Sequence, residues 1–245
     1  MSQDEAVQAA RRQRMLDQAR AGIAVLEQRR TDPVGRGLLG QAVEELGDDL
    51  PDWVLAARER LLAPVPPRLP LRTERLVLRR PRMEDLDALH SWYGREEVAR
   101  YLLTHPLSRD QMEVELRKRS GPPETRPDIL PLVVEYDGRV VGDLVLMIKP
   151  PAYSQAEIGW TLHPDHAGRG IATEAARALL DLAFGHYGLH RVHADLDARN
   201  DRSRAMCERL GMRLETHALQ DFWSKGEWTD TCRYALLREE HAGSR

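Results

Sequence analysis

The fold of this chain is decided by residues 156–175, whose sequence is Ala-Glu-Ile-Gly-Trp-Thr-Leu-His-Pro-Asp-His-Ala-Gly-Arg-Gly-Ile-Ala-Thr-Glu-Ala. The pattern predicts a strand over 156–162, then a glycine-rich turn, then a helix that begins near Gly170. The strand carries one carboxylate, that of Glu157. Residues 168–173 offer successive backbone N–H groups at the positive end of the helix, where a diphosphate can be held. An acid ahead of a phosphate cradle suggests group transfer from a phosphorylated carrier, for which coenzyme A is the best candidate.

The bulk composition excludes several classes of protein. A chain of 245 residues, of which 42% are hydrophobic, can bury a sizeable core. Its net charge of −3 argues against a nucleic-acid partner. No apolar run approaches the ~20 residues that span a bilayer, so we expect no membrane partner. The two cysteines, Cys207 and Cys232, are too few for a disulfide framework and suit a reducing compartment, so the sequence predicts a cytoplasmic protein.

The chain divides into parts of different periodicity. Residues 1–62 place apolar side chains at helical spacing and predict an all-helical extension of unknown role, which could cover a cleft or build a homodimer. Residues 63–70, Ala-Pro-Val-Pro-Pro-Arg-Leu-Pro, predict a stiff Pro-rich linker. Residues 71–240 alternate between strand and helix patterns, as expected of an α/β domain. A formal dinucleotide fingerprint at 35–40 is discounted because no strand precedes it.

Four short motifs then occur in an order that is typical of one enzyme family. The turn at 167–172 matches the pattern Gln/Arg-x-x-Gly-x-Gly/Ala, except that Ala167 replaces the first residue. Segments 71–79, 200–212 and 228–234 match the opening strand, an Asn-x-x-Ser…Leu-Gly-Phe segment with methionine for phenylalanine, and the closing strand. The chain thereby resembles the GNAT acetyltransferases, and their RimJ/RimL-like branch in particular. The resemblance implies a GNAT fold, with a central mixed, mostly antiparallel sheet flanked by helices, and acetyl-CoA as co-substrate.

The same resemblance implies which residues bind the donor. In this family the counterpart of Asn200 hydrogen-bonds the coenzyme A arm, although a turn or helix-cap role is as usual for an asparagine. A backbone N–H within 160–162 is expected to stabilise the oxyanion, and Gly159 is expected to allow a β-bulge there. The expected cofactor-binding residues are Trp160, Thr161, Leu162, Gly168, Arg169, Gly170, Ile171, Ala172, Thr173, Asn200 and Ser203.

Two residues are candidate catalytic groups. An attacking amine must lose a proton, and the carboxylate of Glu157 can accept it directly or through a water molecule. The alternative is an ordinary exposed strand glutamate, but the resemblance favours catalysis, because Ala-Glu-Ile coincides with the base glutamate of the histone-acetylating members. Ser203 and Cys207 compete as the acid that meets the leaving thiolate. The branch resemblance favours Ser203, and we interpret Cys207 as a small buried apolar residue.

The acceptor is the least determined part of the hypothesis. Among the five histidines at 163, 166, 186, 190 and 193, no pair has i, i+4 spacing with a supporting acid on a convincing helix face, so we predict no metal. The expected reaction moves an acetyl group to a primary amine, with a protein N-terminal α-amine as first choice. A small cationic amine, such as a polyamine or an aminoglycoside, is the alternative acceptor. A non-catalytic acyl-CoA-binding sensor or scaffold is the alternative from another class of protein.

Overall fold

A computed structural model describes residues 2–149 and 154–243. Its centre is an eight-stranded sheet with the strand order β1-β2-β3-β4-β5-β6-β8-β7. Within the described residues, β5 and β6 pair in parallel and the other neighbouring strands pair antiparallel. The predicted mixed, mostly antiparallel sheet is therefore confirmed. The strands are β1 Leu71–Arg72, β2 Leu76–Arg79, β3 Ile129–Tyr136, β4 Arg139–Lys149, β5 Gln155–Leu162, β6 Arg191–Asp197, β7 Arg213–Ser224 and β8 Glu227–Leu237.

Helices cover both faces of the sheet. The apolar side chains of β4 at 144, 146 and 148 join one core cluster with those of α7 (Ile171–Gly185) and α8 (Asp201–Arg209). On the opposite face, Val133 of β3 packs with α4 (Leu86–Tyr93) and α6 (Arg109–Arg119). This division follows from the alternation of side chains along a strand. The short helices α5 (Glu96–Ala99) and α9 (Arg238–Gly243) complete the domain.

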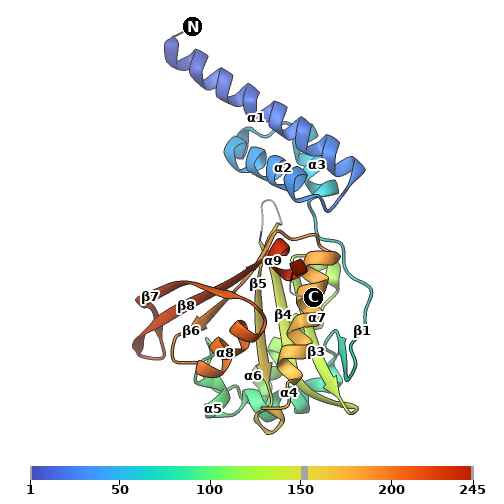
Figure 1. The fold of residues 1–245 in the computed structure, drawn as a ribbon, viewed down its shortest axis with the longest axis vertical. Helices are drawn as coiled ribbons and strands as arrows, with labels where there is room; N and C mark the ends of the chain where they lie inside the picture. Colours follow the sequence, from blue (N-terminus) through green and yellow to red (C-terminus); the bar gives the residue numbers. More distant parts are fainter. Residues whose placement is uncertain (1, 150–153, 244–245) are drawn as a thin grey trace.

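The first part of the chain forms three helices with a core of their own. They are α1 (Gln3–Gln28), α2 (Pro33–Leu46) and α3 (Asp52–Leu61), and they lie beyond one end of the sheet (Figure 1). The discounted glycines at 35–40 lie inside α2, with no strand before them. Among the described residues, no helix combines the length and apolarity needed to cross a bilayer. The division at 63–70 stays a prediction.

The helical unit touches the rest of the protein at the end of α7. Gly188 follows α7 with a φ of +64°, and a Cβ atom added to it would lie 2.4 Å from the Cβ of Thr31. Nearby, Nε2 of His186 lies 2.8 Å from the carbonyl oxygen of Val65. A glycine is therefore required at position 188 for two reasons. Its backbone is left-handed, and the turn between α1 and α2 occupies the space that a side chain would need.

We expect Gly188→Ala to loosen this contact. The left-handed backbone alone costs roughly 1–2 kcal/mol for an alanine, and the clash with Thr31 adds to that. Limited proteolysis should therefore cut the segment 63–70 faster in Gly188→Ala than in the parent protein. Gly185→Ala is the matched control, since Gly185 ends α7 with open space around its Cα. Equal cleavage rates for the two variants would contradict the expectation that this contact holds the helical unit against the end of α7.

Candidate active site

The parallel strands β5 and β6 separate after a short paired stretch. They pair only from Gln155 with Arg191 to Glu157 with His193, although β5 continues to Leu162 and β6 to Asp197. Figure 1 shows β6 leading away from β5 beyond this point. Unpaired strands leave backbone groups without partners, so the gap that opens after Glu157 is a place for a ligand to take up the lost hydrogen bonds.

The backbone of β5 presents amides to this gap. His163 donates its N–H to the carbonyl oxygen of Val141, next to the last residue pair of the β4–β5 ladder. In an antiparallel ladder, hydrogen-bonded residues alternate, so the N–H groups of Trp160 and Leu162 point away from β4 and toward the gap. The expected β-bulge at Gly159 is wrong, because the β4–β5 register runs without a shift from Gln155 to Leu162. The splay comes instead from the early end of pairing with β6.

Side chains around the gap fall on two faces of the sheet. Trp160 and Leu162 pack against the core cluster that contains α7 and α8. Glu157 alternates with them along β5 and therefore lies on the opposite face. Its two partners in register, Met147 on β4 and His193 on β6, lie on that face as well. A molecule bound in the gap on the face covered by α7 and α8 would therefore reach a second molecule bound on the opposite face, beside Glu157.

Glu157 is half-buried and ion-paired. Its Oε2 accepts a hydrogen bond of 2.9 Å from Nζ of Lys149 and lies 3.9 Å from Nε2 of His193. Burial lowers the pKa of His193, which favours its neutral form. Asp195, two residues further along β6, forms two bonds of 2.7 Å with the guanidinium of Arg233. Glu157 therefore lies in a polar cluster at the point where the strands separate.

This cluster was not foreseen from the sequence. Glu157, His193 and Asp195 bring ligand-type atoms within 4.8 Å of one another. Lys149 and Arg233 already neutralise the two carboxylates. The sequence presents His193 only as one of the five histidines between positions 163 and 193. Its neighbours in space are brought together by the parallel pairing of β5 with β6, which cannot be read from spacing along the chain.

On the other face, α8 places a hydroxyl at the gap. The indole Nε1 of Trp160 donates a hydrogen bond of 3.2 Å to Oγ of Ser203. Since the hydroxyl accepts here, its own proton remains available to another acceptor. Cys207 lies one turn further along α8, fully buried, and burial raises the pKa of its thiol to about 12. This geometry separates the two candidate acids, because Ser203 reaches a strand beside the gap and Cys207 lies in the core.

Asn200 acts as the N-cap of α8. Its Oδ1 accepts a hydrogen bond of 3.1 Å from the backbone N–H of Ser203. The helix-cap interpretation of this asparagine is therefore present in the structure, and the cap uses the carboxamide oxygen and not the NH₂ group.

The turn ahead of α7 carries an uncapped helix end. Gly168 and Gly170 have φ values of +75° and +74°, and Gly170 is the N-cap residue. Among the described residues, no side chain caps α7, in contrast to α6 and α8, which begin with Ser108 and Asn200 as capping residues. The first N–H groups of an α-helix have no partner inside the helix, so this end is free to bind an anion. Residues 167–170 are exposed.

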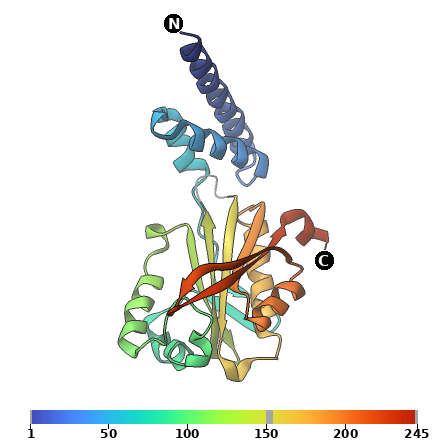
Figure 2. The same cartoon turned by 90° about the vertical axis from the view of Figure 1, so that its left-hand side faces the viewer.

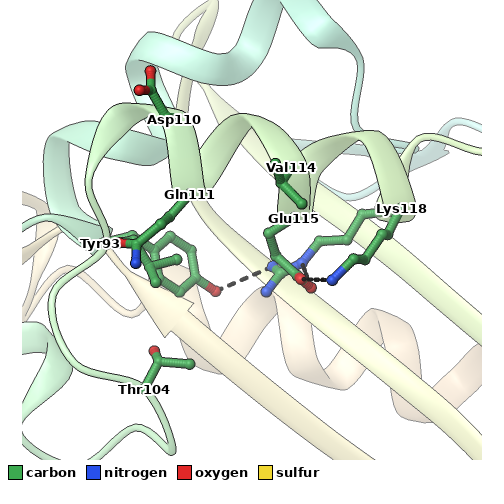
Figure 3. Close-up of a pocket in the computed structure, with 9 residues that line it drawn as sticks. Tyr93, Thr104, Asp110, Gln111, Val114, Glu115 and Lys118 are labelled. Carbon is green, nitrogen blue, oxygen red and sulfur yellow. Dashed lines mark hydrogen bonds and ion pairs between the residues drawn. The ribbon is translucent and has the colours of Figure 1, made fainter.

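A cavity of about 440 Å³ lies beside α6 (Figure 3). It is adjacent to a buried network in which Oη of Tyr93 donates to Oδ2 of Asp143 at 2.8 Å and Nη1 of Arg119 donates to the same oxygen at 2.9 Å. Burial raises the pKa of Asp143, against the opposing effect of Arg119. Asp143 lies opposite Thr161 on the same face of the sheet as Glu157. The cavity is lined by Tyr93, Thr104, Leu107, Asp110, Gln111, Val114, Glu115, Lys118 and Arg119.

This cavity was also missed in the sequence. The available signal was a carboxylate at 143 inside the otherwise apolar run 140–148, since a buried acid needs partners. Its partners come from α4 and α6, which are distant in sequence.

Comparisons with known proteins agree with this arrangement. The acetyltransferase (GNAT) domain family matches residues 75–213, more than half of the chain. A putative ribosomal N-acetyltransferase of Bacillus subtilis strain 168 is 34% identical over 110 residues, which are 45% of this chain and 60% of that protein. A spermidine N(1)-acetyltransferase of Escherichia coli strain K12 is 24% identical over 163 residues, which are 64% of this chain and 83% of that protein. The crystal structure of a GNAT-family acetyltransferase from Bacillus anthracis is similar with a TM-score of 0.64 and 28% identity, covering 70% of this chain and 99% of that one.

The matched segment contains both the strands that separate and the turn ahead of α7. It also contains three of the four motifs on which the family was predicted, at least in part, and that prediction is confirmed. This chain belongs to the GNAT acetyltransferase family, and it is an N-acetyltransferase.

Proposed function

We propose that the protein transfers an acetyl group from acetyl-CoA to a protein N-terminal α-amine by direct attack in a ternary complex. The observation that carries this proposal is the opening between β5 and β6, which begins beside Glu157, together with the uncapped end of α7, the next α-helix after β5 in the chain. The diphosphate of the donor would bind the amides of residues 168–173. Its pantetheine arm would follow β5 on the α8 side, within reach of Asn200 and the free amides of β5.

The two faces of the sheet separate the two proton transfers. On the open face, the amine would give a proton to Glu157 as its nitrogen attacks the thioester carbonyl carbon. The amide of Trp160 or Leu162 would stabilise the oxyanion of the tetrahedral intermediate. When the carbon–sulfur bond breaks, the thiolate would take the hydroxyl proton of Ser203, which solvent then replaces. The ammonium form of the acceptor would compete with Lys149 for Glu157. Binding of the acceptor is therefore coupled to breaking of the Lys149–Glu157 ion pair.

The surroundings of the open face favour a peptide over a small polycation. Three of the acidic side chains that could attract a polyamine are paired, since Asp195 binds Arg233, and Asp197 and Glu227 both bind Arg199. The β7–β8 hairpin instead exposes apolar surface. It crosses in front of the other strands (Figure 2), and its exposed large apolar residues include Leu219, Phe222, Trp223 and Trp228. Near its tip, Nζ of Lys225 binds the carbonyl oxygens of Ala99 and Leu102, which fixes this end of the hairpin against α5.

The first test concerns the base. We expect Glu157→Gln to lower kcat by about 10²-fold at neutral pH with little change in the KM for acetyl-CoA, because only proton removal is lost. Release of free thiol measures both constants. Glu135→Gln is the matched control, since Glu135 is also a strand glutamate, with 26% exposure against 27% for Glu157 and its own ion pair to Arg79. If both variants keep the parent kcat, Glu157 is not the base.

The second test separates Ser203 from Cys207. Ser203→Ala should lower kcat, because the thiolate loses its donor, and the loss should shrink with a thioester of a more acidic thiol. Cys207→Ala should leave kcat unchanged and lower the melting temperature, because it removes a buried sulfur from the core. A larger fall of kcat in Cys207→Ala than in Ser203→Ala would reverse the assignment.

The third test concerns the acceptor. Peptides with a free α-amine should give a higher kcat/KM than spermidine, an aminoglycoside, or the same peptides with a blocked N-terminus and one lysine. Trp223→Ala should lower kcat/KM for the peptide while the KM for acetyl-CoA stays constant. A preference for spermidine would instead support the small-amine alternative. Binding of acetyl-CoA without turnover on any amine would support the sensor alternative.

A further inference from the structure

A side chain from outside the turn holds the proposed diphosphate site together. Arg75 lies just before β2, far from the turn in sequence. Its Nη1 donates a hydrogen bond of 3.2 Å to the carbonyl oxygen of Arg169. Its Nη2 would lie 3.5 Å from a Cβ added to Gly170, so the guanidinium borders the turn itself. Arg75 is thus the link between the edge of the sheet and the loop whose amides would face the phosphates.

The same guanidinium neutralises an acid at the helix end. Glu174 lies in the first turn of α7, and its Oε2 accepts bonds of 2.7 Å from Nε and Nη2 of Arg75. Its Oε1 accepts from the hydroxyl of Thr73 at 2.5 Å and from the backbone N–H of Arg75 at 3.1 Å. Burial would raise the pKa of Glu174, but these hydrogen bonds hold it below its usual value, so the group is ionised at neutral pH.

An ionised carboxylate at this place has two opposing effects. The carboxylate is stabilised by the positive end of the helix dipole when no anion is bound there. It also repels a diphosphate bound at the same end, because like charges within one helical turn raise each other's free energy. The ion pair with Arg75 cancels that repulsion. This cancellation matters more in this chain because the usual glutamine or arginine of the turn is replaced by Ala167, whose side chain contributes no charge or hydrogen bond.

We infer that Arg75 is a positioning residue for the donor diphosphate, acting by holding the carbonyl of Arg169 and by neutralising Glu174. This inference rests on the proposed use of acetyl-CoA. Arg75 should then affect binding of the diphosphate, and not binding of the adenosine 3′-phosphate or of the pantetheine arm. Arg75→Lys keeps the charge but cannot bridge Glu174 and the Arg169 carbonyl in one plane, so the geometric and electrostatic parts are separable.

Calorimetry with CoA and with dephospho-CoA tests the inference, together with the KM for S-acetyl-pantetheine, which lacks the diphosphate. We expect Arg75→Ala to weaken both coenzymes about tenfold, as the loss of one charge-assisted contact would. The KM for S-acetyl-pantetheine should stay within about twofold of the parent value, since nothing in that donor meets the turn. Arg75→Lys should fall between Arg75→Ala and the parent.

The double variant Arg75→Ala, Glu174→Gln supplies the decisive comparison. It should recover much of the lost coenzyme affinity, because the unpaired carboxylate is gone. Arg213→Ala is the control, since Arg213 is a similarly exposed arginine that pairs with Glu215 of β7 and Glu240 of α9. Equal losses for all donors, or no rescue by Glu174→Gln, would mean that Arg75 only supports the fold and would overturn the inference. A parent protein that does not bind CoA would refute the proposed function instead.

Discussion

The structure depends on the parallel pairing of β5 with β6, which ends after Glu157 and His193. A longer ladder would satisfy the backbone of β5 on both sides and leave no room between the strands. A shorter one would detach β6 and the hairpin that follows it. Because pairing stops where it does, the amides of Trp160 and Leu162 stay unpaired, and Glu157 and Ser203 are placed on opposite sides of one opening. The separation of the proposed base from the proposed acid is thus a consequence of strand register.

The polar groups near this opening are held by neighbours from distant segments. Glu157 binds Lys149 of β4, Ser203 receives the indole N–H of Trp160, and Glu174 is bound by Arg75, which lies just before β2. The end of α7 is the exception, since its first amides are left without a side-chain cap. The helices α6 and α8 begin with side-chain caps, whereas α7 begins with a glycine, and its free amides are the proposed site of the donor diphosphate.

The motifs predicted the local elements around the candidate site, and they failed where several strands contribute. The strand, turn and helix over 156–185 are as the pattern predicts, because each depends on residues within one short window. The bulge at Gly159 was wrong, because the splay arises from β6 and not from β5 itself. The buried Asp143 and its partners Tyr93 and Arg119 were missed, since the three residues lie on different elements.

The sequence by itself determined the family, the order of strands and helices and the glycine turn that begins α7. It could do so because periodicity, turn chemistry and short motifs are local properties of the chain. Only the tertiary structure decided which side chains meet: Glu157 with Lys149 and His193, Trp160 with Ser203, and Arg75 with Glu174. These contacts join residues that are far apart in the chain or related only by strand register, and the free energy that selects them comes from packing the whole sheet between its helices.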